Sequence, residues 1–157
     1  MLCALLLLLL WPKPQPKKAF LGSECREYYI SDYTAVAARQ EGKAYLTITT
    51  DQYVNDSGLF MYTFTFTESQ GIPFTIRQFE LVYFLVNDKV LVQTFSGADM
   101  SSSDNSTDLA ANGSFTLEGG FPHNTGVSSI GILARGVDAN GADLSFTAWQ
   151  DVPQPKE

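Results

Sequence analysis

The chain has 157 residues, and its 45% hydrophobic and 17% charged side chains allow one sizeable core but not two ordinary domains. Its formal net charge is −7, and every acidic residue follows position 23. Nucleic acid and anionic membrane surfaces are bound by clustered Lys or Arg, so this charge balance argues against both as partners.

The first eighteen residues, MLCALLLLLLWPKPQPKK, join an apolar run to a spacer rich in Pro and Lys. The run from Leu2 to Trp11 has ten residues, whereas a helix needs about 20 to cross a bilayer. Ten residues are typical of the apolar part of a signal peptide, which predicts export to an extracellular, periplasmic or cell-surface location. An uncleaved anchor and a start codon assigned too late remain alternatives, because no basic residue precedes the run.

Residues 19–33 are rich in charge and tyrosine without a clean period, so we expect an irregular N-terminal segment there. From residue 34 to residue 150, runs of alternating apolar side chains separated by turn formers predict strands. These strands are expected at residues 34–39, 44–50, 60–67, 74–86, 90–95, 114–121, 127–137 and 142–149. Residues 151–157 form a polar tail.

The strand at residues 74–86 changes the parity of its apolar residues. Phe74 and Ile76 have one parity and Phe79 and Leu81 the other, which requires an extra residue and predicts a bulge near Arg77-Gln78. From Phe79 to Val86 the intervening residues are apolar as well. This second apolar face is either covered in the fold or available for self-association.

Turn signals define the connections. Asn87-Asp88 and Asn140-Gly141 are typical of tight hairpins, and residues 96–113 form a polar crossover with one helical turn expected near Ala98–Ser101. No segment shows a helical period. The sequence therefore predicts an all-β antiparallel sandwich of seven or eight strands with Ig-like, Greek-key connections.

The order of these features over residues 34–150 resembles immunoglobulin-like and fibronectin type III-like modules of bacterial exported proteins. The resemblance is carried by the strand from Tyr62 to Ser69, Gly71, Ile76, the apolar strand with its hairpin, Gly113-Ser114-Phe115 and the run from Gly136 to Gly141. It implies a seven-stranded Greek-key sandwich that serves as a spacer, adhesion or carbohydrate-associated module. The paired cysteines with a tryptophan between them, which antibody domains have, are missing here.

Two groups of residues are candidates for ligand binding. Asp138, Asn140 and Asp143 place three oxygen side chains around Gly141, as some calcium loops do, although a plain hairpin turn would select the same residues. Trp149, Tyr53 and Tyr45 belong to a surplus of aromatic side chains that could stack on sugar rings, or could equally be rim residues of an ordinary sandwich.

Reactive groups are sparse. His123 is the only histidine and lies in a Pro-His-Asn-Thr-Gly loop, which favours an exposed loop residue over a general base or a metal ligand. We therefore predict a non-enzymatic exported module that acts as a spacer or as a protein-interaction or adhesion domain, without a cofactor. A carbohydrate-binding module and, from a different class, a small hydrolase of unrecognised type are the alternatives.

Overall fold

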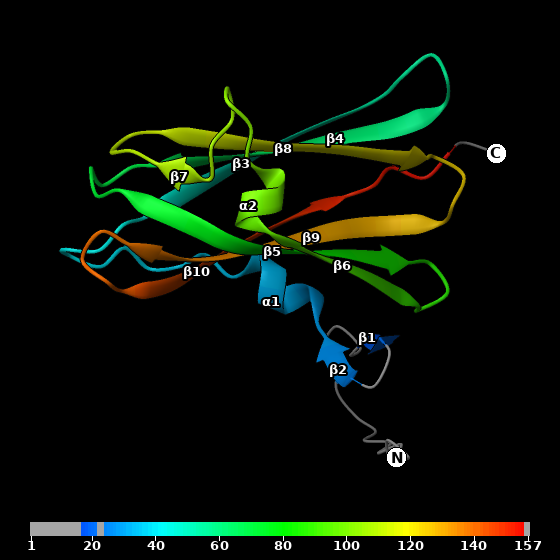
Figure 1. Ribbon diagram of the computed structural model, residues 1–157. Coiled ribbons are helices and arrows are strands. Elements are labelled where there is room, and N and C mark those ends of the chain that lie inside the picture. Colours follow the sequence, from blue (N-terminus) through cyan, green and yellow to red (C-terminus); the bar gives the residue numbers. More distant parts are fainter. Residues whose placement is uncertain (1–16, 22–23, 156–157) are drawn as a thin grey trace.

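The computed structural model describes residues 17–21 and 24–155, so the predicted export signal before residue 17 lies outside the described residues. Two antiparallel sheets face one another across a common core, and a short N-terminal hairpin lies to one side (Figure 1). The strands are β1 (Lys17–Leu21), β2 (Glu24–Tyr28), β3 (Leu46–Val54), β4 (Leu59–Glu68), β5 (Phe74–Leu85), β6 (Val90–Ser96), β7 (Asp108–Leu109), β8 (Ser114–Pro122), β9 (Val127–Asp138) and β10 (Asp143–Asp151). The helices are α1 (Ile30–Thr34) and α2 (Gly97–Met100). The predicted all-β class is confirmed. The two sheets together contain eight strands, which agrees with the predicted seven or eight in number, but β7 takes the place of the strand expected at residues 34–39.

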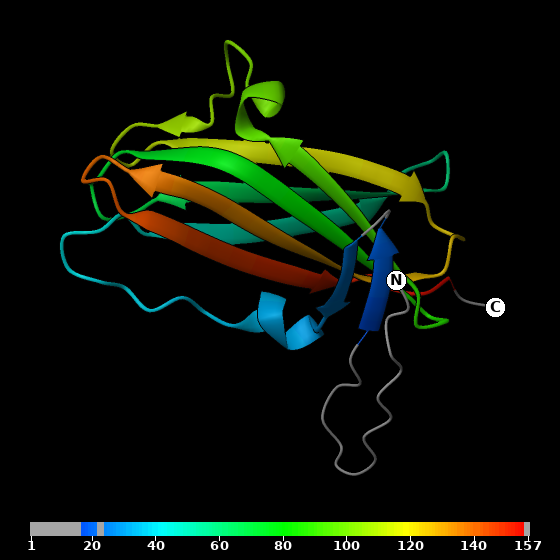
Figure 2. The same ribbon diagram turned by 60° about the horizontal axis from the view of Figure 1, so that its bottom comes forward.

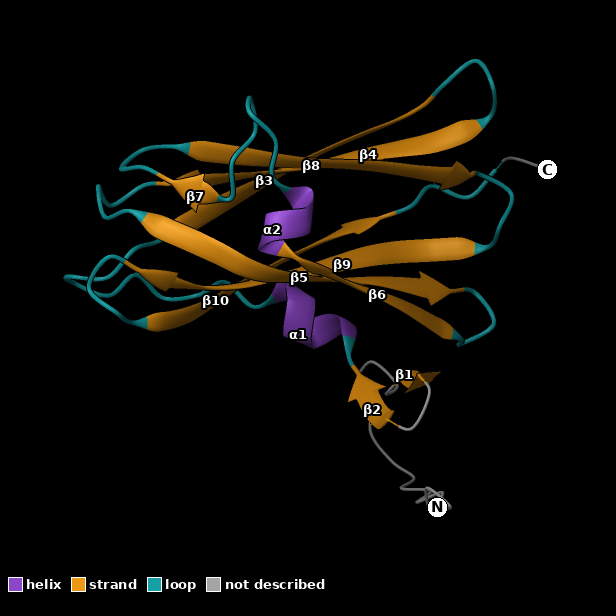
Figure 3. Cartoon of the chain, in the orientation of Figure 1, coloured by secondary structure: helices purple, strands orange, loops and turns teal. Residues whose placement is uncertain are grey.

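One sheet has the order β3-β4-β8, and the other has the order β10-β9-β5-β6 with β7 added beside the start of β5. Figure 3 shows that strands make up both layers, while the two helices are short segments outside the sheets. The N-terminal β1 and β2 pair only with each other among the described strands.

Phenylalanine side chains fill the space between the sheets. Alternate residues of β4 point inward, and Phe64 and Phe66 are fully buried. Phe79 of β5 packs against Phe66 and Phe115, with ring centroids 5.4 and 5.2 Å apart, and so joins the two sheets. Aromatic pairs in this arrangement contribute roughly 0.5–1.5 kcal/mol each beyond their burial.

The predicted bulge in β5 is present. Ile76 is opposite Gly136 and Gln78 is opposite Arg135, so Arg77 is the extra residue. The bulge lets Ile76 and Phe79, which have opposite parity in sequence, both enter the core.

The predicted turns are also present. Asp88 has a φ of 63° in the β5–β6 hairpin, and Gly141 has a φ of 84° in the β9–β10 hairpin. The crossover after β6 begins with α2, one residue before the expected helical turn. The chain then passes from the five-stranded to the three-stranded sheet between β7 and β8.

The structure differs from the sequence predictions in two N-terminal segments. Residues 19–33, expected to be irregular, contain the end of β1, all of β2 and most of α1. β1 and β2 pair with each other, and Tyr28 and Tyr33 pack on the five-stranded sheet. Residues 34–39, expected to form a strand, form none: Thr34 ends α1 and residues 35–40 have no regular structure. This segment follows the edge of β10 without pairing with it (Figure 2).

Candidate functional site

The second apolar face, predicted from Phe79 to Val86, is covered by the chain itself. Val82 and Phe84 point away from the main core, and both are fully buried. Residues 28–34, which we call the strap, lie over them, and Tyr28 and Tyr33 are buried in the contact. Val86, the residue after β5, is exposed.

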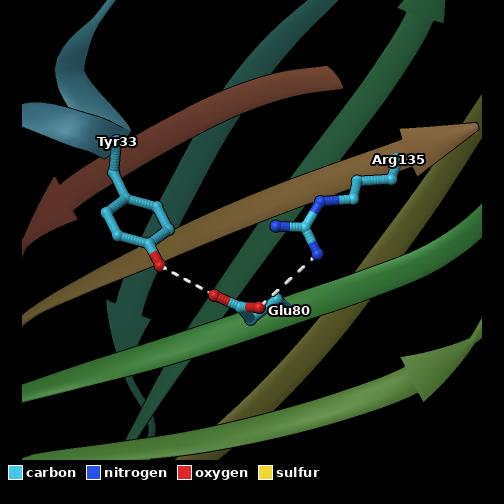
Figure 4. Close-up of polar contacts among 3 residues, drawn as sticks. All are labelled: Tyr33, Glu80 and Arg135. Atoms are coloured by element: carbon cyan, nitrogen blue, oxygen red, sulfur yellow. Dashed lines mark hydrogen bonds and ion pairs between the residues drawn. The ribbon is translucent and has the colours of Figure 1, made fainter. Parts of the chain in front are cut away.

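The side chain of Tyr33 extends from α1 toward Glu80 on the sheet (Figure 4). Its hydroxyl donates a hydrogen bond to Glu80 Oε1 at 3.2 Å, and Arg135 Nη1 lies 3.7 Å from Glu80 Oε2. The Tyr33 ring meets Phe84 edge-on and lies over Gly131, where a Cβ atom would be 2.6 Å from the ring. Gly131 is therefore required for this contact, since any larger residue would collide with the ring.

The outer face of the three-stranded sheet has the opposite character. Its outward side chains on β3, β4 and β8 form rows of hydroxyls, and neither helix covers this face in Figure 1. We call it the threonine face, and it consists of Thr47, Thr49, Thr63, Thr65, Thr67 and Thr116.

The strand registers set the spacing of the threonine face. Thr49, Thr65 and Thr116 form one row across the three strands, and the Thr65 and Thr116 hydroxyls lie 3.3 Å apart. Neighbouring strands are about 4.8 Å apart, and successive residues of one face are about 6.7 Å apart along a strand. The result is a regular grid of hydroxyl and methyl groups.

At one end of this grid, acidic and aromatic side chains lie beside the threonines. Asp51 and Glu118 flank Thr63 in one row, and Tyr53 lies opposite Met61 in the next. Tyr53 is 59% exposed, more than any other aromatic side chain between residues 28 and 155. Carboxylates and an exposed ring thus lie side by side at this end.

The three aromatic residues predicted to bind a ligand do not form one site. Tyr53 points outward from the three-stranded sheet. Trp149 belongs to β10 in the other sheet, where it packs against the cluster that contains Tyr28 and Tyr33 of the strap. Tyr45 is partly buried against Phe146, with Arg39 4.9 Å above its ring. Of the three, Tyr53 alone has the exposure that stacking on a sugar requires.

The predicted calcium residues occupy the β9–β10 turn. The Asp138 carboxylate accepts hydrogen bonds from the backbone amides of Ala44, Asn140 and Ala142. The Asn140 side chain donates to the carbonyl of Gly42, and Asp143 lies at the exposed start of β10. Within the described residues, no three His, Cys, Asp or Glu side chains are grouped closely enough to hold a metal ion.

A further buried carboxylate, Glu68, is not among the site residues predicted from the sequence. It accepts backbone hydrogen bonds from Gln70, Gly71 and Asn112, and a longer one from Tyr45. Burial by itself would raise the pKa of Glu68, but these hydrogen bonds outweigh it and hold the pKa below its usual value. The pKa of Asp138 is lowered in the same way, with a further contribution from Lys43.

A hydroxyl-rich groove of about 450 Å³ lies between α2 and the bulge of β5. Its Ser101 and Thr107 hydroxyls are bonded to each other at 2.6 Å, and Thr107 also donates to the carbonyl of Gly97. His123 does not line this groove: its ring stacks on Phe60 and is hydrogen-bonded to the carbonyl of Pro153. The groove therefore brings no nucleophile to a histidine base.

None of the helices in the described part of the chain has the length and apolarity needed to cross a membrane. No family model and no curated protein matches the sequence.

Seven chains of solved structures have a similar fold. A Bordetella pertussis protein provisionally named ApaA matches with a TM-score of 0.58 and 14% identity, over 73% of this chain and 98% of that one. The structural genomics target SoR45 matches with a TM-score of 0.50 and 12% identity, over 74% and 91%. At these identities the likeness shows a shared fold and nothing about activity.

Proposed function

We propose that the protein is an exported, non-enzymatic β-sandwich module that works by contact with a protein partner, as a spacer or adhesion domain. The observation that carries this proposal is the difference between its two outer faces. The apolar part of the outer face of the five-stranded sheet is covered by the strap, whereas the threonine face is open and regular. The open face is accordingly the surface available to a partner.

The state of the buried acids supports a non-enzymatic role. Glu68 and Asp138 are bonded to backbone amides, and Glu80 is bonded to Tyr33 and paired with Arg135. Each of these carboxylates stabilises a turn or a packing contact. The proposal requires no cofactor.

The strand order supports a relation to immunoglobulin-like and fibronectin type III-like modules. If β3, β4, β5, β6, β8, β9 and β10 are taken as seven successive strands, the first, second and fifth form one sheet. The seventh, sixth, third and fourth form the other, which is the arrangement expected of a Greek-key sandwich of this kind. Many such modules are connectors or adhesion domains, and this analogy favours the proposed role.

A charge placed in the centre of the threonine face tests the proposal. Labelled full chain is applied to an array of purified extracellular proteins, and Thr49→Lys is compared with Thr125→Lys, which adds the same charge in an exposed loop. We expect at least a tenfold loss of binding for Thr49→Lys and none for Thr125→Lys. Equal binding by both variants would place the contact surface elsewhere on the molecule.

Carbohydrate binding is the second candidate, favoured by the exposed Tyr53 beside Asp51 and Glu118. An aromatic face and neighbouring carboxylates can stack on a sugar ring and accept hydrogen bonds from its hydroxyls. A glycan array probed with the full chain and with Tyr53→Ala separates the two candidates. Glycan binding that disappears in Tyr53→Ala would favour this second function over contact with a protein.

A further inference from the structure

The strap is a locally weak element in a well-formed binding site. α1 has five residues, and no side chain caps its first turn at Tyr29. A helix of this length does not form alone in water, because the free-energy cost of nucleating a helix exceeds the stabilisation that a single turn provides. Its position is therefore fixed by the burial of Tyr28 and Tyr33 against the sheet.

The site that receives the strap belongs to the sandwich. We call it the seat, and it consists of the outward residues of β5 and β9: Glu80, Val82, Phe84, Gly131 and Leu133. The same two strands contribute Phe79, Leu81, Ile130 and Ile132 to the main core on their inner side. The seat is held in shape by that core, whether or not a strap lies in it.

Residues 35–40, which connect the strap to the rest of the chain, have little spare length. Ala35 has an extended backbone, and residues 35–40 run along β10 toward the turn before β3 (Figure 2). Two hydrogen bonds join this segment to the sandwich: Thr147 donates to the carbonyl of Ala35 and Gln70 to that of Gln40. Ala37 also packs against the main core, and Arg39 lies over the Tyr45 ring. Val36 is 85% exposed.

We propose that the strap is exchangeable and that the seat also takes the strap of a second copy of this chain, which gives a strap-exchanged dimer. The exchanged form repeats every contact of the closed monomer, including the bond from Tyr33 to Glu80. The choice between the two forms therefore depends on the connecting segment and on protein concentration. With the natural connection the strap's own effective concentration is high, on the order of millimolar, so the closed monomer prevails in dilute solution.

Shortening the connecting segment tests the proposal in the full chain. Deleting residues 36–38 removes about 10 Å of extended chain, so the strap can no longer reach its own seat. We expect light scattering to report twice the monomer mass for this variant. Inserting three glycines at the same place is the matched control and should leave a monomer.

A second substitution distinguishes strap exchange from direct pairing of exposed seats. Tyr33→Ser added to the deletion removes the main anchor of the strap and should restore the monomer. A dimer that persists in this double variant would mean that the seats pair face to face, and it would overturn the proposal. A monomeric deletion variant would also overturn it.

A peptide experiment covers the case in which the deletion variant does not fold. Tyr33→Ala in the full-length chain removes one anchor of the strap, so the strap should leave the seat more often, and a fluorescent peptide of residues 24–35 should bind to the seat saturably. A Tyr33→Ser version of the peptide should bind at least tenfold more weakly. Absence of binding by the unmodified peptide would refute exchange.

Discussion

Single residues at one end of the sandwich organise several turns at once. Glu68 joins the turn after β4 to Asn112 before β8, and Asp138 joins the β9–β10 turn to Ala44 before β3. Asp138 was predicted to lie in a turn because Asn140-Gly141 follows it closely. Glu68 could have been noticed, since it has the inward parity of Phe64 and Phe66, but its partner Asn112 is 44 positions away in the chain.

Both carboxylates should make the fold sensitive to acid. Their folded-state pKa values are lowered, so the stability they contribute is complete above their ordinary pKa, near 4, and is lost as the pH falls through the folded-state values. We expect the free energy of unfolding, measured with urea, to decrease between about pH 5 and pH 2. In Glu68→Gln this decrease should be smaller.

At neutral pH, Glu68→Gln should lower the free energy of unfolding by roughly 1–3 kcal/mol, because an amide has a single acceptor oxygen for four backbone donors. Glu118→Gln, which changes an exposed carboxylate on β8, is the control. If both variants showed the same acid dependence as the unmodified chain, the buried carboxylates would not be its cause.

At the scale of the elements, alternation predicted most strands and even the bulge at Arg77, because a buried face imposes period two on the sequence. It failed for residues 34–39 because a strand also needs a neighbour, and this segment lies beside β10 without pairing. Which strands pair, and which strand edges stay unpaired, depends on the three-dimensional arrangement. The outer edge of β8 is an unpaired edge of this kind, and there a side chain forms the hydrogen bonds that a neighbouring strand would form.

Asn105 protects the edge of β8. Its amide nitrogen donates to the carbonyl of Thr116 at 2.6 Å, and its oxygen accepts from the Thr116 amide at 2.9 Å. Asn105→Ala should lower the free energy of unfolding by about 1–2 kcal/mol and leave a backbone edge able to pair with another chain. Asn124→Ala, at an exposed loop position, should change neither stability nor aggregation.

The test is urea unfolding combined with light scattering of concentrated samples over several days. Faster aggregation is expected for Asn105→Ala alone. Equal aggregation of the Asn105 and Asn124 variants would show that this edge is protected by something other than the Asn105 side chain.

At the scale of the whole molecule, the five-stranded sheet separates two apolar clusters. The main core lies between the sheets, and the smaller cluster lies between the strap and the seat. The sequence indicated two apolar faces on one strand but not what covered the second, because Tyr28 and Tyr33 lie in a segment without a periodic pattern. The covering depends on packing between residues more than 45 positions apart.

This separation predicts two levels of cooperativity, because a region held by few contacts opens with less free energy than the core. In Tyr33→Ala, amide exchange should accelerate in α1, while the midpoint of urea unfolding of the sandwich changes little. Phe79→Ala removes a fully buried ring from the main core and should lower the free energy of global unfolding by roughly 3–5 kcal/mol. Hydrogen exchange measured residue by residue distinguishes the two effects. If Tyr33→Ala accelerated exchange equally in α1, β4 and β8, the strap and the sandwich would unfold as one unit, and the strap could not leave its seat while the sandwich stays folded.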